Sequence, residues 1–156
     1  HRRHLSFRRR RLVVARLGVR YERHDIPGHV RKKKRPDIRV EIFQTRDKSI
    51  WNVFAKHHYL NHSFNKAADT FVMYVNDELA GFTSTLPFVH PRVKNTRQGH
   101  RTVVLPDFQG IGLGVYLRDF IADHYLKRGL SYITTTSNPA LVNYMTKSPK
   151  WICTRF

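Results

Sequence analysis

The segment Gln109-Gly110-Ile111-Gly112-Leu113-Gly114 places three glycines at alternate positions. Residues 100–105 before it have the composition of a strand, and residues 113–127 repeat apolar side chains at helical spacing. Glycine lets the backbone approach a ligand closely. The first N–H groups of a helix have no intrahelical acceptor and lie at the positive end of the helix dipole. A strand, a glycine turn and a helix start in series therefore predict a phosphate-binding site, with an ordinary tight turn as the alternative.

Two common classes of phosphate site do not fit this segment. No Gly-Lys-Ser/Thr follows the glycines, which excludes a P-loop. The spacing of the glycines is not GxGxxG, and no βαβ unit comes before them, which argues against a dinucleotide-binding domain.

The glycine turn lies within a pattern of alternating strands and helices. Residues 76–78 predict a hairpin turn, and residues 87–99 carry prolines and a glycine that predict a loop. The order of the elements predicts a mixed sheet with helices packed on it. We expect strands at residues 38–42, 70–75, 79–86, 100–105 and 131–136 and from Trp151 onward, and helices near 50–58, 113–127 and 139–147.

Positive charge is concentrated at the start of the chain. The 156 residues carry a net charge of +18, and residues 1–40 alone hold 15 Lys and Arg against 3 Asp and Glu. Such an excess favours binding to polyanions, with a solvated tail as the alternative. We expect residues 1–36 to form a basic extension and residues 37–156 one domain. The candidate nucleic-acid contacts are Arg8, Arg9, Arg10, Arg11, Arg31, Lys32, Lys33, Lys34 and Arg35.

Composition also limits the cellular setting and the chemistry. Cys153 is the single cysteine, so an internal disulfide is impossible and a zinc spacing is missing. No apolar run reaches the roughly 18 residues that a membrane span needs. We expect a cytoplasmic protein that binds no metal and no membrane.

The glycine turn resembles the signature of the GNAT superfamily of acetyltransferases, Gln/Arg-x-x-Gly-x-Gly/Ala, with Gln109, Gly112 and Gly114 at the matching positions. This resemblance implies an α+β fold with a mixed, mostly antiparallel sheet and flanking helices, in which the strand at 100–105 splays from the strand at 131–136. It also implies that acetyl-coenzyme A, or another acyl-coenzyme A, is the cofactor. The implied cofactor-binding residues are Val103, Val104, Leu105, Gln109, Gly110, Ile111, Gly112, Leu113, Gly114 and Asn138.

The resemblance also suggests the catalytic side chains. Residues 138–144 resemble the family's helix that carries a proton donor for the leaving thiolate, which implies this role for Tyr144. His100 is the candidate general base, because its ordinary pKa suits proton transfer. His57, His58 and Tyr59 lie where the family often binds its acceptor. The usual Gly-Phe after the helix is missing, and the second strand of the C-terminal hairpin is expected to be absent.

These features favour an N-acyltransferase that modifies an amine on or near DNA or RNA. Two segments, His-His-Tyr-Leu and His-Arg-Thr-Val-Val-Leu-Pro-Asp, resemble GNAT-like proteins of bacteriophages and mobile elements. The alternative is a non-catalytic GNAT-fold module that binds nucleic acid within a larger, phage-like assembly. A third possibility is a small-molecule amine acetyltransferase whose basic extension aids solubility.

Overall fold

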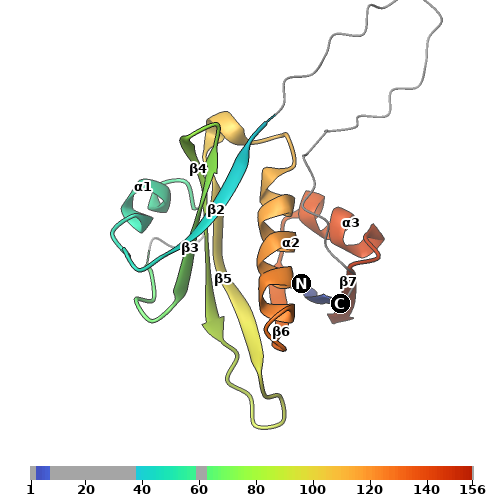
Figure 1. Cartoon of the computed structure of the whole chain (residues 1–156). Helices are drawn as coiled ribbons and strands as arrows, with labels where there is room; N and C mark the ends of the chain where they lie inside the picture. The colour runs from blue at the N-terminus through green and yellow to red at the C-terminus, as the bar shows by residue number, and fades with distance from the viewer. Residues whose placement is uncertain (1–2, 8–37, 59–62, 156) are drawn as a thin grey trace, which may run out of the picture.

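A computed structural model of the chain describes residues 3–7, 38–58 and 63–155 (Figure 1). Seven strands form one sheet in the order β2-β3-β4-β5-β6-β1-β7. The strands are β1 (Arg3–Phe7), β2 (Val40–Thr45), β3 (Asp69–Val75), β4 (Glu78–Pro87), β5 (Thr96–Val104), β6 (Ser131–Thr136) and β7 (Trp151–Arg155). The helices are α1 (Trp51–Ala55), the 3-10 turn η1 (Pro106–Phe108), α2 (Leu113–Leu126) and α3 (Pro139–Lys147).

Strands β2 to β5 form an antiparallel meander, in line with the mostly antiparallel sheet that the GNAT resemblance implies. Asn76 and Asp77 join β3 to β4, and both have positive φ angles, 49° and 70°. Positive φ at both central residues is the requirement of the type I′ turn, whose twist matches that of a hairpin. The predicted hairpin turn at residues 76–78 is therefore confirmed.

The predicted loop at residues 87–99 was too long. Strand β4 continues to Pro87 and β5 already begins at Thr96, so Gly99 is a strand residue. Proline is tolerated at the end of a strand, and glycine is suited to a place where another backbone comes close. A Cβ atom at Gly99 would lie 2.6 Å from the hydroxyl oxygen of Tyr132 on β6. Gly99 thus leaves room for the side chains of Tyr132 and Thr134 on β6.

Strands β5 and β6 pair in parallel over only three residue pairs, from Thr96–Ser131 to Gln98–Ile133. Both strands continue beyond that point, β5 to Val104 and β6 to Thr136, without further pairing to each other. The two strands therefore diverge, and the edge of β5 that faces β6 stays open. The mixed sheet with one splayed strand pair is the predicted fold class.

Strand β1 is a finding that the sequence did not predict. It lies between β6 and β7 and pairs antiparallel with both, for example Leu5 with Thr134 and with Cys153. Residues 3–7 of the expected basic extension are thus part of the sheet, and they are the neighbour of β7, for which no second C-terminal hairpin strand was predicted. The residue 36/37 boundary stays a prediction, because residues 8–37 lie outside the described part of the chain.

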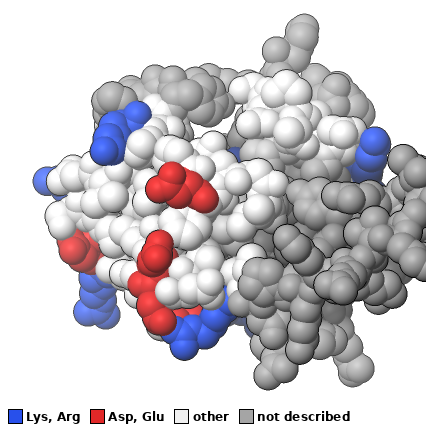
Figure 2. Space-filling model, turned by 90° about the horizontal axis from the view of Figure 1, so that it is seen from above, with Lys and Arg blue, Asp and Glu red and all other residues white. Residues whose placement is uncertain are grey.

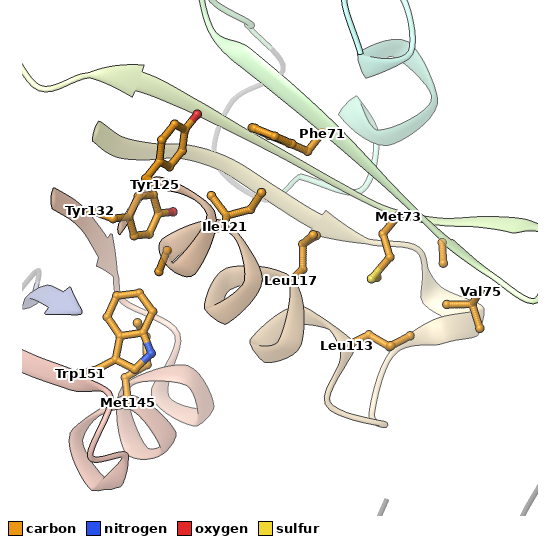
Figure 3. Close-up of a cluster of buried hydrophobic side chains, with 12 residues drawn as sticks. Phe71, Met73, Val75, Leu113, Leu117, Ile121, Tyr125, Tyr132, Met145 and Trp151 are labelled. Carbon is orange, nitrogen blue, oxygen red and sulfur yellow. The ribbon is translucent and has the colours of Figure 1, made fainter. Parts of the chain in front are cut away.

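Helix α2 supplies the main core. Leu113, Leu117 and Ile121 recur every four residues and are buried against Phe71 and Met73 of β3 (Figure 3). Burial of each such side chain stabilises the fold by about 1.5–3 kcal/mol. The core fixes α2 against the sheet, and with it the position of the glycine turn at the start of the helix.

A second, smaller core lies under α1. Trp51 and Phe54 pack on Phe82 and Val103, and Figure 1 shows α1 and α2 on opposite faces of the sheet. The helix is shorter than predicted, because it ends before His57 and His58. No helix among the described residues is long and apolar enough to cross a membrane.

Candidate active site

A cleft of about 410 Å³ lies in the wedge between the diverging strands β5 and β6. Residues 99–104 of β5 and 134–136 of β6 form two of its walls, and the glycine turn with the start of α2 forms the third. Asn138 and Leu141 of α3 and His57 and His58 after α1 complete the lining. Residues far apart in the sequence are thus brought to one site by the splay of two strands.

Glycine is required in the turn by its backbone conformation. Gly110 and Gly112 have φ angles of 83° and 87°, a region that side chains rarely adopt. Gly112 is also the N-cap of α2, and the first bond of the helix runs from the N–H of Tyr116 to the Gly112 carbonyl. The N–H groups of Leu113 and Gly114 come before that bond and have no intrahelical acceptor, so they are available to an anion.

Gln109 stabilises the turn from its other end. Its side-chain Nε2 donates a hydrogen bond of 2.8 Å to the carbonyl oxygen of Val104, the last residue of β5. The Gln109 side chain therefore links the end of β5 to the start of the glycine turn.

His100 is the extra residue of a β-bulge in β5. Thr85 of β4 pairs with Gly99 and Ser84 pairs with Arg101, so His100 has no partner in the register. A bulge turns a side chain away from its regular direction, and here it brings the imidazole to the cleft. Nε2 of His100 is buried and has no hydrogen-bond partner among the described residues.

The electrostatic surroundings keep His100 neutral. Burial lowers the pKa of His100 to about 4, and electrostatic interactions with Arg101 and His58 add to this shift. A neutral imidazole is present throughout the physiological pH range, but a group with this pKa holds a proton weakly. This limits the power of His100 as a general base.

The charged residues in the cleft wall are basic. Arg101 and Arg118 line it, and the lining contains no Asp or Glu among the described residues. Nη1 of Arg118 donates a 3.2 Å hydrogen bond to Oγ1 of Thr134 on β6. The site therefore offers a positive potential to an anionic ligand. Arg118 and the threonines of β6 were not predicted as site residues from the sequence. A basic side chain on the helix after the glycine turn was the available signal for Arg118.

The structure does not bring Tyr144 into the cleft. Its side chain is not part of the lining, and its hydroxyl donates a 3.2 Å hydrogen bond to Oδ2 of Asp119 on α2. Burial and the negative charge of Asp119 raise the pKa of Tyr144. Met145, the next residue on α3, is buried in the main core. The catalytic role of Tyr144 stays a prediction that this placement does not favour.

Most of the other candidate residues do meet in the cleft. Asn138 lines it and also caps α3, because its Oδ1 accepts bonds from the N–H groups of Ala140 and Leu141. Leu105 and Ile111 are not part of the lining. Tyr59 and the basic runs Arg8–Arg11 and Arg31–Arg35 lie outside the described residues. The predicted residues that line the cleft are His57, His58, His100, Val103, Val104, Gln109, Gly110, Gly112, Leu113, Gly114 and Asn138.

Comparison with known proteins gives a family match and several structural neighbours. The model of the acetyltransferase (GNAT) family matches residues 37–148. No curated protein matches the chain. A solved protein from the GNAT family of Novosphingobium aromaticivorans has a TM-score of 0.62 at 12% identity. The match covers 99% of this chain and 60% of that protein, so the chain spans less than two thirds of its neighbour's length.

Two further structures are similar over the same fold. The ribosomal-protein-S18-alanine N-acetyltransferase of Escherichia coli has a TM-score of 0.53 at 18% identity, with 67% of this chain and 73% of that chain covered. An acetyltransferase of Bacillus subtilis, solved in complex with CoA, has a TM-score of 0.50 at 18% identity, with 69% and 71% covered. At these identities the similarity shows the fold alone.

Proposed function

The chain belongs to the GNAT family of acetyltransferases, whose members use acetyl-coenzyme A, and on this premise we propose that it transfers an acetyl group from that thioester to an amine in the β5–β6 cleft. One observation carries the proposal. The pairing of β5 with β6 ends at Gln98, and the open edge of β5 leads directly to the glycine turn and the start of α2. The extended pantetheine arm of coenzyme A, which ends in a phosphate, fits the open edge of β5 followed by the glycine turn and the start of α2.

The residues present fit the cofactor. The positive φ angles of Gly110 and Gly112 shape a turn with no side chain above it, and α2 presents unpaired N–H groups there. Val103 and Val104 offer the open backbone edge of β5 to the pantetheine arm. Arg118 and Arg101 add positive charge, and none of the described lining residues is acidic. The bound cofactor supplies an acyl group activated as a thioester.

The chain itself has to provide a neutral amine and a place for it. Because Arg101 and Arg118 are positively charged, the cleft disfavours an ammonium ion and lowers the pKa of a bound amine. The amine then enters as the unprotonated nucleophile, without a carboxylate base. His100, with its neutral ring and unpartnered Nε2, orients the acceptor by a hydrogen bond rather than by taking its proton.

Calorimetric titration with acetyl-coenzyme A tests the proposal. We expect saturable binding by the wild type and a loss of at least about ten-fold in affinity, or about 1.4 kcal/mol, in Gly112→Glu. Gly129→Glu is the matched control, because Gly129 also has a positive φ, 76°, but lies at the far end of α2, away from the cleft. Equal weakening in both variants, or no binding by the wild type, would contradict the proposed cofactor site.

We further propose that the acceptor amine lies on or near a nucleic acid. The support is the net charge of +12 in residues 1–40, out of +18 for the chain. On the face drawn in Figure 2, acidic and basic side chains of the described residues are interspersed around a large uncharged area. The excess charge is thus concentrated in the segment that joins β1 to β2.

The test must leave β1 in place, because deletion of residues 1–36 would remove a strand of the sheet. Replacement of Arg8–Arg11 and Arg31–Arg35 by Gln neutralises the runs and keeps Arg3–Phe7. We expect DNA and RNA binding to weaken and its salt dependence to decrease by about 0.7–0.9 per lost phosphate contact. Arg92→Gln in the β4–β5 hairpin is the single-charge control. Unchanged affinity and salt dependence would count against this acceptor class.

A non-catalytic GNAT-fold module is the second candidate. It is favoured by the lack of an acidic side chain in the described lining, the low pKa of His100 and the placement of Tyr144 outside the cleft. Acetylation assays with DNA and tRNA, read by release of the free thiol, separate the two candidates. Thiol release that needs an acceptor and fails in Gly112→Glu supports the enzyme. Nucleic-acid binding without any release supports the module.

A further inference from the structure

We propose that the acceptor carries an oxyanion, a carboxylate or a phosphate, beside its amine, and that Arg101 at the β5 bulge binds this group. The inference rests on the proposed function only in calling the ligand the acceptor. The anion site itself follows from the side chains around the bulge.

Three buried polar atoms without a hydrogen-bond partner among the described residues meet at this bulge. They are Nε of Arg101, Nε2 of His100 and Oγ of Ser84. Arg101 and His100 are neighbours on β5, and Ser84 is the register partner of Arg101 on β4. Buried polar groups are normally satisfied, so a local group of three unsatisfied ones indicates a ligand or ordered water. Arg101 and His100 line the cleft, whereas Ser84 lies fully buried beside them.

Arg101 also has no carboxylate partner within the described part of the chain. Its Nη1 and Nη2 donate to the carbonyl oxygens of His100 and Ser63, each at 3.3 Å, and it forms no ion pair. Arg97, four residues earlier on the same strand, pairs with Asp69 at 3.2 Å. A half-buried guanidinium without a counter-ion is costly, and an anionic ligand would compensate it.

The anion site is separate from the phosphate site at the glycine turn. Arg101 bonds to Ser63, and His100 packs on Phe64, with ring centroids 5.8 Å apart. Phe64 belongs to the core under α1, whereas Leu113 after the glycine turn belongs to the core under α2. The two ends of the cleft therefore lie on opposite faces of the sheet, one for the cofactor's phosphates and one for the acceptor.

The donor set at the bulge matches an oxyanion. Arginine N–H groups prefer carboxylate and phosphate oxygens, and such charge-assisted bonds are about twice as strong as neutral ones. His100 is neutral and can donate from Nε2, so it adds a hydrogen bond without a charge. The positive potential that acts on His100 from Arg101 and His58 also favours an anion at this place.

The test follows the ring signals of His100 by NMR at pH 7.5 and constant ionic strength while acetate or inorganic phosphate is added. His100→Gln assigns the signals. Saturating coenzyme A is present to fill the glycine turn, and a parallel series uses Gly112→Glu without coenzyme A. We expect a saturable shift in the wild type and in Arg92→Gln, and at least about ten-fold weaker anion affinity in Arg101→Gln, since that variant loses the charge-assisted bonds to the anion.

The relative affinities for acetate and phosphate identify the anionic group on the acceptor. Stronger binding of acetate indicates a carboxylate on the acceptor, and stronger binding of phosphate indicates a phosphorylated one. No saturable shift with either anion, or equal affinity in wild type and Arg101→Gln, overturns the proposal. The amide signals of Gly110 and Gly112 report coenzyme A binding in the same samples. If these amide signals do not shift, coenzyme A does not bind and the proposed function fails. The anion site is still tested in that case, because its affinity is also measured in Gly112→Glu without coenzyme A.

Discussion

Nε1 of Trp151 donates a 2.8 Å hydrogen bond to Oδ1 of Asp119, which ties the first residue of β7 to the middle of α2. The other carboxylate oxygen of Asp119 accepts bonds from the Tyr144 hydroxyl at 3.2 Å and from Nζ of Lys150 at 3.0 Å. One buried carboxylate thus joins α2, α3 and β7, the elements that hold β6 and the far wall of the cleft.

Asp119→Ala should destabilise the protein by about 2–3 kcal/mol, because it removes the charged acceptor of three hydrogen bonds in a buried place. Urea unfolding measures the change. Asp123→Ala, one turn later on α2, is the matched control: its carboxylate is also buried but pairs within its own helix, with Lys127, rather than across elements, so we expect a smaller loss. If Asp119→Ala loses no more stability than Asp123→Ala, Asp119 does not hold α2, α3 and β7 together.

Tyr144→Phe should reduce kcat by less than about ten-fold, because the hydroxyl bonds to Asp119 and does not line the cleft. A general acid typically contributes about 100-fold or more to the rate. Steady-state acetylation kinetics and acetyl-coenzyme A titration decide whether Tyr144 is a structural residue or the general acid. A fall of 100-fold with unchanged cofactor affinity would restore Tyr144 as the proton donor.

Leu5→Pro should weaken the attachment of β7. Strand β1 pairs on both sides, with β6 and β7, and proline cannot donate a ladder hydrogen bond. We expect a loss of at least about 1 kcal/mol in stability, the usual net contribution of one hydrogen bond, and faster amide exchange in Trp151–Arg155. Leu5→Ala is the control for the lost side chain, since it keeps the backbone N–H. Equal effects of both substitutions would show that the backbone pairing is not the cause.

The low pKa of His100 predicts how stability depends on pH. The ring is neutral in the folded state down to about pH 4, whereas the unfolded chain takes up a proton near the ordinary value of 6.5. The unfolded state therefore binds more protons between these values, so His100 lowers stability as the pH falls from 6.5 to 4. His100→Gln should flatten the urea midpoint over this window. The same pH dependence of the urea midpoint in His100→Gln and in the wild type would disprove the lowered pKa of His100.

The glycine turn of the site could be predicted from the sequence, whereas the register of β5 against β4 could not. The glycine turn could be identified because positive φ and a helix start impose glycine on positions 110 and 112. The bulge at His100 depends on how many residues of β4 stand opposite β5, which no local pattern specifies. The placement of Tyr144 depends on the rotation of α3, where one residue changes the direction of a side chain by about 100°.

Strand β1 escaped prediction for a different reason. Its composition, with Arg3 and His4 followed by further arginines, is typical of a solvated tail, and its partners lie more than 120 residues away in the sequence. Local propensity contains no information about such a pairing. The secondary-structure pattern therefore predicted the individual strands and the hairpin turn at residues 76–78, and the GNAT resemblance implied the splayed pair, whereas the position of β1 in the sheet was not predicted.

The position of β1 has a consequence for the order of folding. Residues 3–7 leave the ribosome well before β6 and β7, to which they pair, because those strands lie in residues 131–155. At a synthesis rate of about 5–20 residues per second, the interval is on the order of 10 s. Long-range pairing of this kind raises the contact order and slows folding. The meander and α2 can assemble during translation before β6 is made, whereas closure of the sheet has to wait for residues 131–155.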